Sequence, residues 1–591
     1  MTQANQSHPN WGVSMLTPDR ACFTIWAPGC STMALEIEGN PLLPMRAAPD
    51  GYFMIEAACT AGACYRFVTD TGQAVADPAS RLQAGDVHDA SVVVDAVPYE
   101  WQNPDWRGRP WHEAVIYELH PGACGGYAGI ETMLPRLAKL GITAVELMPI
   151  ADFPGRHNWG YDGVLPYAPD TAYGTPDQLR HMIDTAHGLD LMVFLDVVYN
   201  HFGPDGNYLH AYAPQFFRDD IKTPWGSAID YRRDPVRRYF IDNAIYWLKT
   251  FQFDGLRFDA VHAIHDNGFL ATMATEIRNV MPPQRHVHLV LENDDNNATL
   301  LTVGASGPLY DAQWADDTHH CLHVLLTGEQ SGYYEDYPDA AEQLARCLSS
   351  GFAYQGEASP HRDGERRGTP SGHLPPTAFV AFLQNHDQIG NRALGERLTT
   401  MADPHALRAA ILLLLLSPQI PLIFMGEEFG ETRPFLYFTD HQSADLAEAV
   451  RQGRRREFAK FAAFSSKEVP QNIPDPNDPA TFTASVPTFA SNPHASSWFE
   501  FYAALLEIRH KIIMPRSVGA RSGGASALGR TGVRAVWHMG DGMRLIIAAN
   551  FGSESLICDL GNGTVLASSR NSAAKTSEIA ARTAIAWLER P

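Results

Sequence analysis

The chain has 591 residues, enough for several domains, and 45% of them are hydrophobic and 19% charged, as in ordinary globular proteins. Its 67 acidic residues outnumber its 45 Lys and Arg residues and give a formal net charge of −22. A chain this acidic repels nucleic acid and anionic lipid, so we expect neither as a partner, and a neutral substrate fits better.

The N-terminal part of the chain, residues 10–97, consists of short alternating or apolar runs separated by Gly, Pro and Asn. This pattern predicts a small immunoglobulin-like β-sandwich domain over residues 1–100. The stretch MTQANQSHPNWG at the start is polar, without a charged region followed by an apolar one, and predicts no signal peptide. The segment WQNPDWRGRPW (101–111) is interpreted as a linker that packs against the next domain.

The central part of the chain alternates between apolar strands and amphipathic helices. The eight candidate strands are 114–120, 142–150, 191–199, 253–261, 287–294, 310–317, 378–387 and 420–428. Such alternation predicts a parallel sheet covered by helices on both faces. Eight strands favour a (β/α)₈ TIM barrel over an open sheet, and we expect it to span residues 101–515, with long loops after the third and sixth strands.

The longest apolar run, residues 409–426, is broken by Ser417, Pro418 and Pro421, so it predicts a buried helix, a turn and a buried strand instead of a membrane span. Residues 516–591 return to short β-like runs and predict a small C-terminal β domain, although 572–590 is less clearly strand-like. The 8 cysteines include no CxxC pair and no metal-ligand spacing. This is typical of reduced thiols in a cytosolic protein, and we expect a cytoplasmic location.

Four acidic residues follow apolar runs at the places where barrel strands end: Asp196, Asp259, Glu292 and Asp387. A single acid of this kind is more often a helix cap or a surface residue. Four at equivalent places indicate an active site, because the carboxyl ends of the strands build the active site of a TIM barrel. Polar companions lie close to them in the sequence, namely Asn200, His201, Arg257, His262 and His386.

The chemistry of these residue types fits the cleavage of a glycosidic bond. That reaction needs one protonated carboxyl for the leaving oxygen and one ionised carboxylate at the anomeric carbon. Arg257 stands two residues before Asp259 on the same strand face, so it would keep Asp259 ionised and suit it to be the nucleophile. Glu292 has no Arg at that spacing, which favours a raised pKa and a general-acid role. No HExxH, P-loop or dinucleotide glycine pattern occurs, and we expect neither a metal nor a cofactor.

Four segments resemble, in order and spacing, the signature segments of the α-amylase family of glycoside hydrolases: DVVYNH (196–201), GLRFDAVH (255–262), LVLEND (289–294) and FLQNHD (382–387). The resemblance implies that Asp259 is the nucleophile, Glu292 the acid/base and Asp387 the stabiliser of the transition state. It also implies a structural role for Asp196 beside Arg257. The further substrate-binding residues that it implies are Tyr161, His201, Arg257, His262 and His386.

Six further segments resemble one subfamily, the malto-oligosyltrehalose trehalohydrolases: 144–169, 201–209, 223–231, 351–370, 382–398 and 431–441. Members of that subfamily are retaining hydrolases of trehalose biosynthesis that need no cofactor. They cleave the α-1,4 bond next to the terminal α,α-trehalose of maltooligosyltrehalose, releasing trehalose and a maltooligosaccharide. Trp225 is then expected to shape the leaving-group side of the site, together with the basic stretch Arg362, Arg366 and Arg367.

Two alternatives remain open at this point. A 1,4-α-glucan branching enzyme has the same catalytic residues and passes the covalent intermediate to a sugar hydroxyl instead of water. A non-catalytic glucan-binding scaffold is the more remote alternative. Phe216, Phe217, Tyr333 and Tyr354 are candidate stacking platforms for a glucan, with ordinary packing as their other reading. The oligomeric state stays open between monomer and homodimer.

Overall fold

The computed structural model describes residues 11–94, 99–223, 225–302, 307–458, 473–488, 493–559, 563–570 and 577–590. The polar segment 1–10, on which the expectation of no signal peptide rests, lies outside the described residues. Among those that are described, no helix combines the length and the apolar character that crossing a membrane requires.

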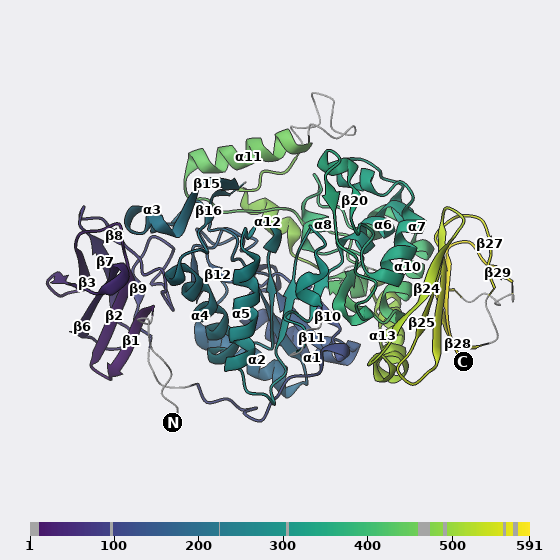
Figure 1. The fold of residues 1–591 in the computed structure, drawn as a ribbon, viewed down its shortest axis with the longest axis horizontal. Helices are drawn as coiled ribbons and strands as arrows, with labels where there is room; N and C mark the ends of the chain where they lie inside the picture. Colours follow the sequence, from purple (N-terminus) through teal and green to yellow (C-terminus); the bar gives the residue numbers. More distant parts are fainter. Residues whose placement is uncertain are drawn as a thin grey trace.

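A closed barrel of eight parallel strands forms the centre of the molecule (Figure 1). In barrel order, its strands are β10 (Ile116–Leu119), β11 (Ala144–Leu147), β14 (Met192–Val197), β17 (Gly255–Phe258), β18 (His288–Leu291), β19 (Ala312–Trp314), β22 (Phe379–Phe382) and β23 (Ile420–Phe424). β23 pairs with β10 and closes the ring. Each strand lies inside one of the eight predicted runs, so the predicted (β/α)₈ fold is confirmed.

Helices cover the outside of the barrel. They include α1 (Gly126–Leu140), α2 (Pro176–Gly188), α4 (Asp234–Thr250), α5 (Asn267–Val280), α6 (Asp316–Thr327), α7 (Ala340–Ser350), α10 (Pro404–Leu416) and α13 (Ala495–Ile508). Thr175 and Gln178 form a capping box at the start of α2, which explains why that helix begins there. α10 and β23 occupy the long apolar run, as predicted, and residues 409–416 of α10 are all apolar and buried.

An apolar cluster fills the interior of the barrel. Phe194, Trp314 and Phe382 lie in its interior cluster, and Trp106 and Trp111 of the predicted linker pack against that cluster. Trp111 also donates to the carbonyl oxygen of Thr377 at 2.7 Å. The predicted linker therefore packs against the interior of the barrel, as expected.

Two antiparallel sheets form the N-terminal domain. One has the order β1 (Gly12–Thr17), β2 (Arg20–Trp26), β6 (Tyr52–Ala58) and β5 (Arg46–Ala47). The other has the order β4 (Leu43–Pro44), β3 (Met33–Ile37), β7 (Cys64–Thr69) and β8 (Ala74–Val75), with β9 (Ser91–Val92) beside β7. Trp11 packs edge-on against Tyr239 of α4 at a centroid distance of 4.9 Å, which joins this domain to the barrel.

A five-stranded antiparallel sheet forms the C-terminal domain, at the opposite flank of the barrel (Figure 1). Its order is β24 (Arg521–Leu528), β25 (Gly532–His538), β26 (Arg544–Asn550), β30 (Thr583–Glu589) and β28 (Thr564–Ser568). β27 (Leu556–Ile557) and β29 (Glu578–Ile579) pair separately. The stretch that looked less strand-like thus contains β30, which pairs with β26 along its whole length. The exact domain boundaries at residues 100 and 515 stay a prediction.

Insertions between strands and helices extend over the carboxyl end of the barrel. β12 (Ala151–Asp152) and β13 (Leu165–Pro169) follow the second strand, and the hairpin of β15 (Phe217–Thr223) and β16 (Gly226–Ile229) follows the third. β20 (Glu357–Ala358) and β21 (Arg366–Arg367) belong to the long connection after the sixth strand. Insertions after the third and sixth strands agree with the prediction. The insertion after the eighth strand, which contains α11 (Ala444–Phe458) and α12 (Pro479–Ser485), was not predicted.

Candidate active site

A pocket of about 600 Å³ opens at the carboxyl end of the barrel. Seven of the ten residues predicted from the sequence line it: Tyr161, His201, Trp225, Asp259, His262, Glu292 and Asp387. The other three, Asp196, Arg257 and His386, do not line the pocket but contact residues that do. The fold therefore brings all ten together.

Arg257 lies at the centre of the site, and its guanidinium contacts three carboxylates. Nη1 donates to Asp196 Oδ2 at 2.6 Å and to Asp259 Oδ1 at 2.9 Å, and Nη2 lies 2.8 Å from Glu292 Oε2. The side chain is completely buried and stacks on Trp314 at 4.2 Å. The sequence spacing predicts Arg257 as a partner of Asp259 and predicts no arginine for Glu292. The parallel pairing of β17 with β18 brings Glu292 to the same guanidinium.

The two carboxylates beside Arg257 have different surroundings. Burial raises the pKa of Glu292, and Arg257 only partly opposes that effect. Asp259 accepts a second hydrogen bond from Asn200 Nδ2 at 2.6 Å, so donors hold both of its oxygens. Ala260 follows with a φ of +39°, a strained value for a residue with a side chain, and its N–H donates to Glu292 Oε2 at 2.7 Å. The strained backbone at Ala260 thus places an N–H group where it holds the Glu292 carboxyl in one orientation.

The third carboxylate, Asp387, lies in the first turn of α8 (His386–Gly390), whose N-cap is the Asn385 side chain. His386 Nε2 lies 3.5 Å from Asp387 Oδ1 and 2.8 Å from the hydroxyl of Tyr161. Burial raises the pKa of Asp387, and the neighbouring His386 opposes this. The Tyr161 hydroxyl donates to Asp196 Oδ2 at 2.6 Å, which connects this side of the pocket to Arg257.

Asp196 is almost completely buried, and burial raises its pKa to about 7 although Arg257 lies beside it. Its Oδ2 accepts from both Arg257 and Tyr161. These contacts fit the expected structural role, since Asp196 holds two other side chains and does not line the pocket.

His201 and Trp225 form the opposite wall. His201 Nε2 contacts the carbonyl oxygen of Tyr161 at 2.9 Å, and its Nδ1 contacts the Asn200 side chain. Burial lowers the pKa of His201 to about 4, so its imidazole is neutral at pH 7. Trp225, from the β15–β16 hairpin, stacks on His201 at 4.5 Å and leaves 47% of its surface exposed at the pocket.

Among the described residues, no group of three or more His, Cys, Asp or Glu side chains is arranged to hold a metal ion.

His262 lines the pocket, and its Nδ1 accepts a hydrogen bond from the backbone N–H of Asp294 at 3.4 Å. The site consists of three carboxylates, one buried guanidinium and a ring of histidines and aromatic residues. Such an arrangement can move protons and bind sugar hydroxyls.

Comparisons with known proteins identify, over most of the chain, the family that the sequence segments resemble. Residues 98–220 match the model described as "Alpha amylase, catalytic domain", and residues 520–587 match a domain of unknown function, DUF3459. The malto-oligosyltrehalose trehalohydrolase of Deinococcus radiodurans is 40% identical over 502 residues, which cover 83% of this chain and 81% of that protein. The chain belongs to the malto-oligosyltrehalose trehalohydrolase family. The family predicted from the sequence is therefore confirmed.

Two other similarities show how far the family relationship extends. A solved structure titled as a putative alpha amylase from Salmonella typhimurium is 42% identical, with a TM-score of 0.92 over 98% of this chain and 99% of that one. The branching enzyme GlgB of Corynebacterium jeikeium is 32% identical over 266 residues, which cover 40% of this chain and 37% of that enzyme. The similarity to the trehalohydrolase family thus extends over about twice as much of the chain as the similarity to GlgB.

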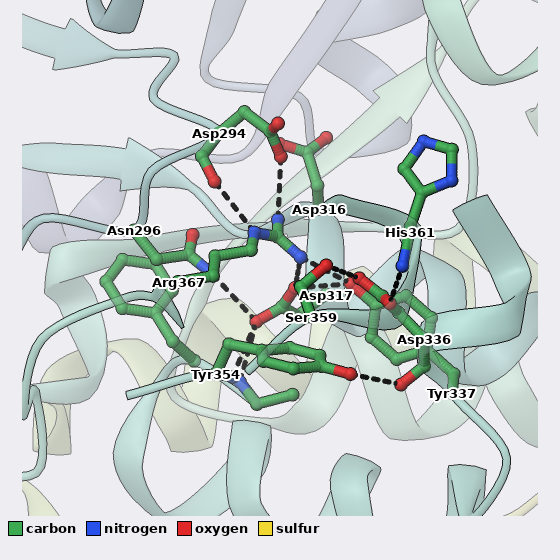
Figure 2. A network of polar contacts seen from close by, with 12 residues as sticks. Asp294, Asn296, Asp316, Asp317, Asp336, Tyr337, Tyr354, Ser359, His361 and Arg367 are labelled. Atoms are coloured by element: carbon green, nitrogen blue, oxygen red, sulfur yellow. Dashed lines mark hydrogen bonds and ion pairs between the residues drawn. The ribbon is translucent and has the colours of Figure 1, made fainter. Parts of the chain in front are cut away.

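In the basic stretch expected on the leaving-group side, Arg362 and Arg367 contact acidic residues that follow β18, and Figure 2 shows Arg367 with Asp294. Arg367 is buried, with Nη2 at 2.8 Å from Asp294 Oδ1 and Nη1 at 3.1 Å from Asp317 Oδ1. Arg362 pairs with Asp294 and Asp295. Although burial acts the other way, these arginines lower the pKa of Asp294 to about 2. Arg367 therefore anchors its loop two residues after Glu292, whereas Arg366 is exposed.

The proposed stacking platforms lie away from the pocket lining. Phe216 is completely buried and packs on Trp26 at a centroid distance of 6.0 Å. Phe217 stacks on His210, and the hydroxyl of Tyr354 donates to the carbonyl oxygen of Asp336 at 2.6 Å. For these side chains the structure favours the alternative reading, ordinary packing.

Several pocket residues were missed by sequence reasoning: Trp159, Asp162, Asn391, Tyr437, His441, Leu446 and Val450. Trp159 had a detectable signal, since it stands two residues before Tyr161 in NWGYDG. Leu446 and Val450 lie four residues apart on α11, a mainly polar helix that carried no catalytic motif. Glu118, within the apolar run of β10, is a buried carboxylate that contacts His386.

Proposed function

We propose that this protein is a retaining glycoside hydrolase that cleaves the α-1,4-glucosidic bond next to the terminal α,α-trehalose of maltooligosyltrehalose. The products are trehalose and a maltooligosaccharide. The names of the full-length relatives support the substrate. The chemistry is supported most by one observation, the single guanidinium of Arg257 in contact with both Asp259 and Glu292.

Asp259 is the proposed nucleophile and Glu292 the proposed acid/base. Glu292, with its raised pKa, protonates the leaving oxygen while Asp259 Oδ attacks the anomeric carbon and forms a glycosyl-enzyme. Glu292 then takes a proton from water, which attacks the anomeric carbon and releases Asp259. Retention requires the two carboxyls to lie about 5 Å apart. Contacts of 2.9 and 2.8 Å with one guanidinium support such a close arrangement.

The remaining residues hold the sugar on the non-reducing side of the bond. Asp387 accepts hydrogen bonds from sugar hydroxyls in the transition state, and the adjacent His386 donates another. Tyr161 provides an aromatic face against the ring, and His201 holds Tyr161 in place by donating from Nε2 to its carbonyl oxygen. Trp225 offers an exposed indole face at the mouth, where we place the leaving trehalose.

The branching-enzyme alternative predicts a different product from the same intermediate. The partial match to GlgB gives it less support than the trehalohydrolase relatives give the hydrolase. The experiment is incubation with maltotriosyltrehalose and, separately, with amylose, followed by chromatography. Trehalose and maltotriose support the hydrolase, and new α-1,6 branches on amylose support the transferase. No turnover of either substrate supports the non-catalytic scaffold.

The proposed partner is the oligosaccharide alone, in the cytoplasm, with the protein as a monomer or homodimer. All eight cysteines are free thiols, and five of them are buried, which suits a reducing compartment. Cell fractionation tests the location, and light scattering during gel filtration tests the oligomeric state.

A further inference from the structure

We propose that Glu118 is a positioning residue that holds His386 as an imidazolium and thereby directs its Nε2–H toward Tyr161 and Asp387, which line the sugar site. The proposal rests on the function proposed above, because that function gives Tyr161 and Asp387 a sugar to bind. It adds a residue from the first barrel strand, far in the sequence from every recognised motif.

The geometry of Glu118 joins two distant parts of the chain. Its side chain is almost completely buried within β10, and its two oxygens contact a residue 268 positions away. Oε2 accepts the backbone N–H of His386 at 3.1 Å, and Oε1 lies 2.5 Å from His386 Nδ1. One carboxylate thus fixes both the start of α8 and the imidazole ring.

The hydrogen bond to Glu118 determines what the other ring nitrogen does. With Nδ1–H donated to Glu118, a neutral imidazole would present Nε2 as an acceptor, and an imidazolium presents it as a donor. The Tyr161 hydroxyl, 2.8 Å from Nε2, already donates to Asp196 and can accept from His386. Asp387 Oδ1, 3.5 Å away, is also an acceptor. Both neighbours therefore suit a donating Nε2–H.

The charges around His386 come from several elements. The titratable groups facing it are Glu118 on β10, Glu146 on β11, Arg257 on β17, Asp387 on α8, and Tyr161 and His120 on loops. Burial and Arg257 act against the cation. Glu118 and Asp387 outweigh them, and the pKa of His386 rises to about 9.

Glu146 provides a matched control within the same barrel. It is the cross-strand partner of Glu118 and equally buried, with 1% of its surface exposed. Its carboxyl oxygens have no hydrogen-bond partner among the described residues, and burial raises its pKa well above the ordinary value. The two glutamates thus share their burial and paired strand positions, whereas only Glu118 makes hydrogen bonds to His386.

The test is a histidine titration of the full-length protein by NMR with isotope-labelled histidine. The His386 signal is assigned from its absence in His386→Gln. We expect wild-type His386 to remain cationic at pH 8, and Glu118→Gln to lower its pKa by about two units, since an opposite charge in contact shifts a pKa by about 1–3 units. Glu146→Gln should leave it within about half a unit, because Glu146 makes no hydrogen bond to His386 and burial disfavours its charged form. A wild-type His386 that titrates below pH 7 overturns the proposal, and so does an unchanged pKa in Glu118→Gln.

A kinetic readout separates positioning from a loss of packing. In Glu118→Gln, the ratio of kcat/KM at pH 8 to kcat/KM at pH 5.5 should fall about tenfold or more relative to wild type, because His386 is then largely neutral at pH 8. An equal loss at both pH values contradicts the proposal. Glu118→Asp keeps the charge and should retain a His386 pKa above 8, which keeps the test decisive if the glutamine variant does not fold. The NMR titration does not depend on catalysis. A protein that is inactive on maltotriosyltrehalose therefore refutes the proposed function, whereas the His386 pKa tests the role of Glu118.

Discussion

Replacing Arg257 by Met tests the centre of the proposed mechanism. Methionine has a similar length, fills the space against Trp314 and carries no charge. The substitution removes contacts at 2.6, 2.9 and 2.8 Å with Asp196, Asp259 and Glu292. It therefore leaves three carboxyls beside one another without a cation.

The size of the effect follows from the burial of these groups. One pair of unit charges about 4 Å apart interacts by about 4 kcal/mol at an effective dielectric constant of about 20. Desolvation of the guanidinium offsets much of this attraction, and breaking a buried pair costs about 3–5 kcal/mol, which is the loss that we expect. Asp196 bears most of it, because its side chain is 2% exposed, against 11% for Asp259 and 17% for Glu292. Asp196→Asn in the same chain should therefore restore part of the stability.

Urea unfolding followed by tryptophan fluorescence measures the stability, and trehalose release measures kcat. We expect kcat to fall about 10²–10³-fold or more, the usual effect of removing one preorganised donor at a reacting carboxylate or oxyanion. Arg285→Met is the matched control, because Arg285 pairs with buried Asp254 at 3.4 Å and does not line the pocket. It should lose stability and keep its activity. An Arg257→Met variant with a loss below about 1 kcal/mol and activity within tenfold of wild type would refute this reasoning.

Three further substitutions test single roles. Asp259→Asn should remain folded by circular dichroism and lose nearly all activity, about 10⁴-fold or more, and substantial residual turnover would exclude it as the nucleophile. Glu292→Gln should lose the alkaline limb of the kcat/KM profile, because its raised pKa supplies the acid. A substrate whose leaving group needs no proton should recover activity, and equal losses on both substrates would contradict that role. Trp225→Ala should raise KM about 10-fold with little change in kcat, as expected for about 1.5 kcal/mol of lost apolar contact, and an unchanged KM would show that the indole does not meet the substrate.

Much of the barrel could be predicted because each strand can be recognised in the sequence as an apolar run. Strands such as Met192–Val197 are buried on both faces and are therefore nearly continuously apolar, which sets them apart from the amphipathic helices. The acids that follow them were found for the same reason, as charges interrupting apolar runs. β30 was less clear because Ala584 and Ala586 have low strand propensity, and its pairing with β26 determines its structure.

The contacts that could not be predicted depend on neighbours across the barrel. Glu292 meets Arg257 through the register of two strands, which no spacing along the chain contains. Glu118 meets His386 because the first and last parts of the barrel adjoin, although a glutamate within VIYEL was a visible anomaly. Leu446 and Val450 reach the pocket from a helix whose placement depends on tertiary packing alone.

No residue of the N-terminal or C-terminal sheets lines the pocket; every lining residue lies between Trp159 and Val450. The N-terminal and C-terminal domains flank the barrel (Figure 1). Trp225 of the β15–β16 hairpin and Leu446 and Val450 of α11 line the pocket. The strand ends thus carry the proposed catalytic carboxylates, whereas insertions such as the β15–β16 hairpin and α11 carry part of the pocket wall. Chimeras that swap these insertions between family members should transfer substrate preference and leave the barrel's chemistry in place, whereas exchanging the flanking sheets should change neither.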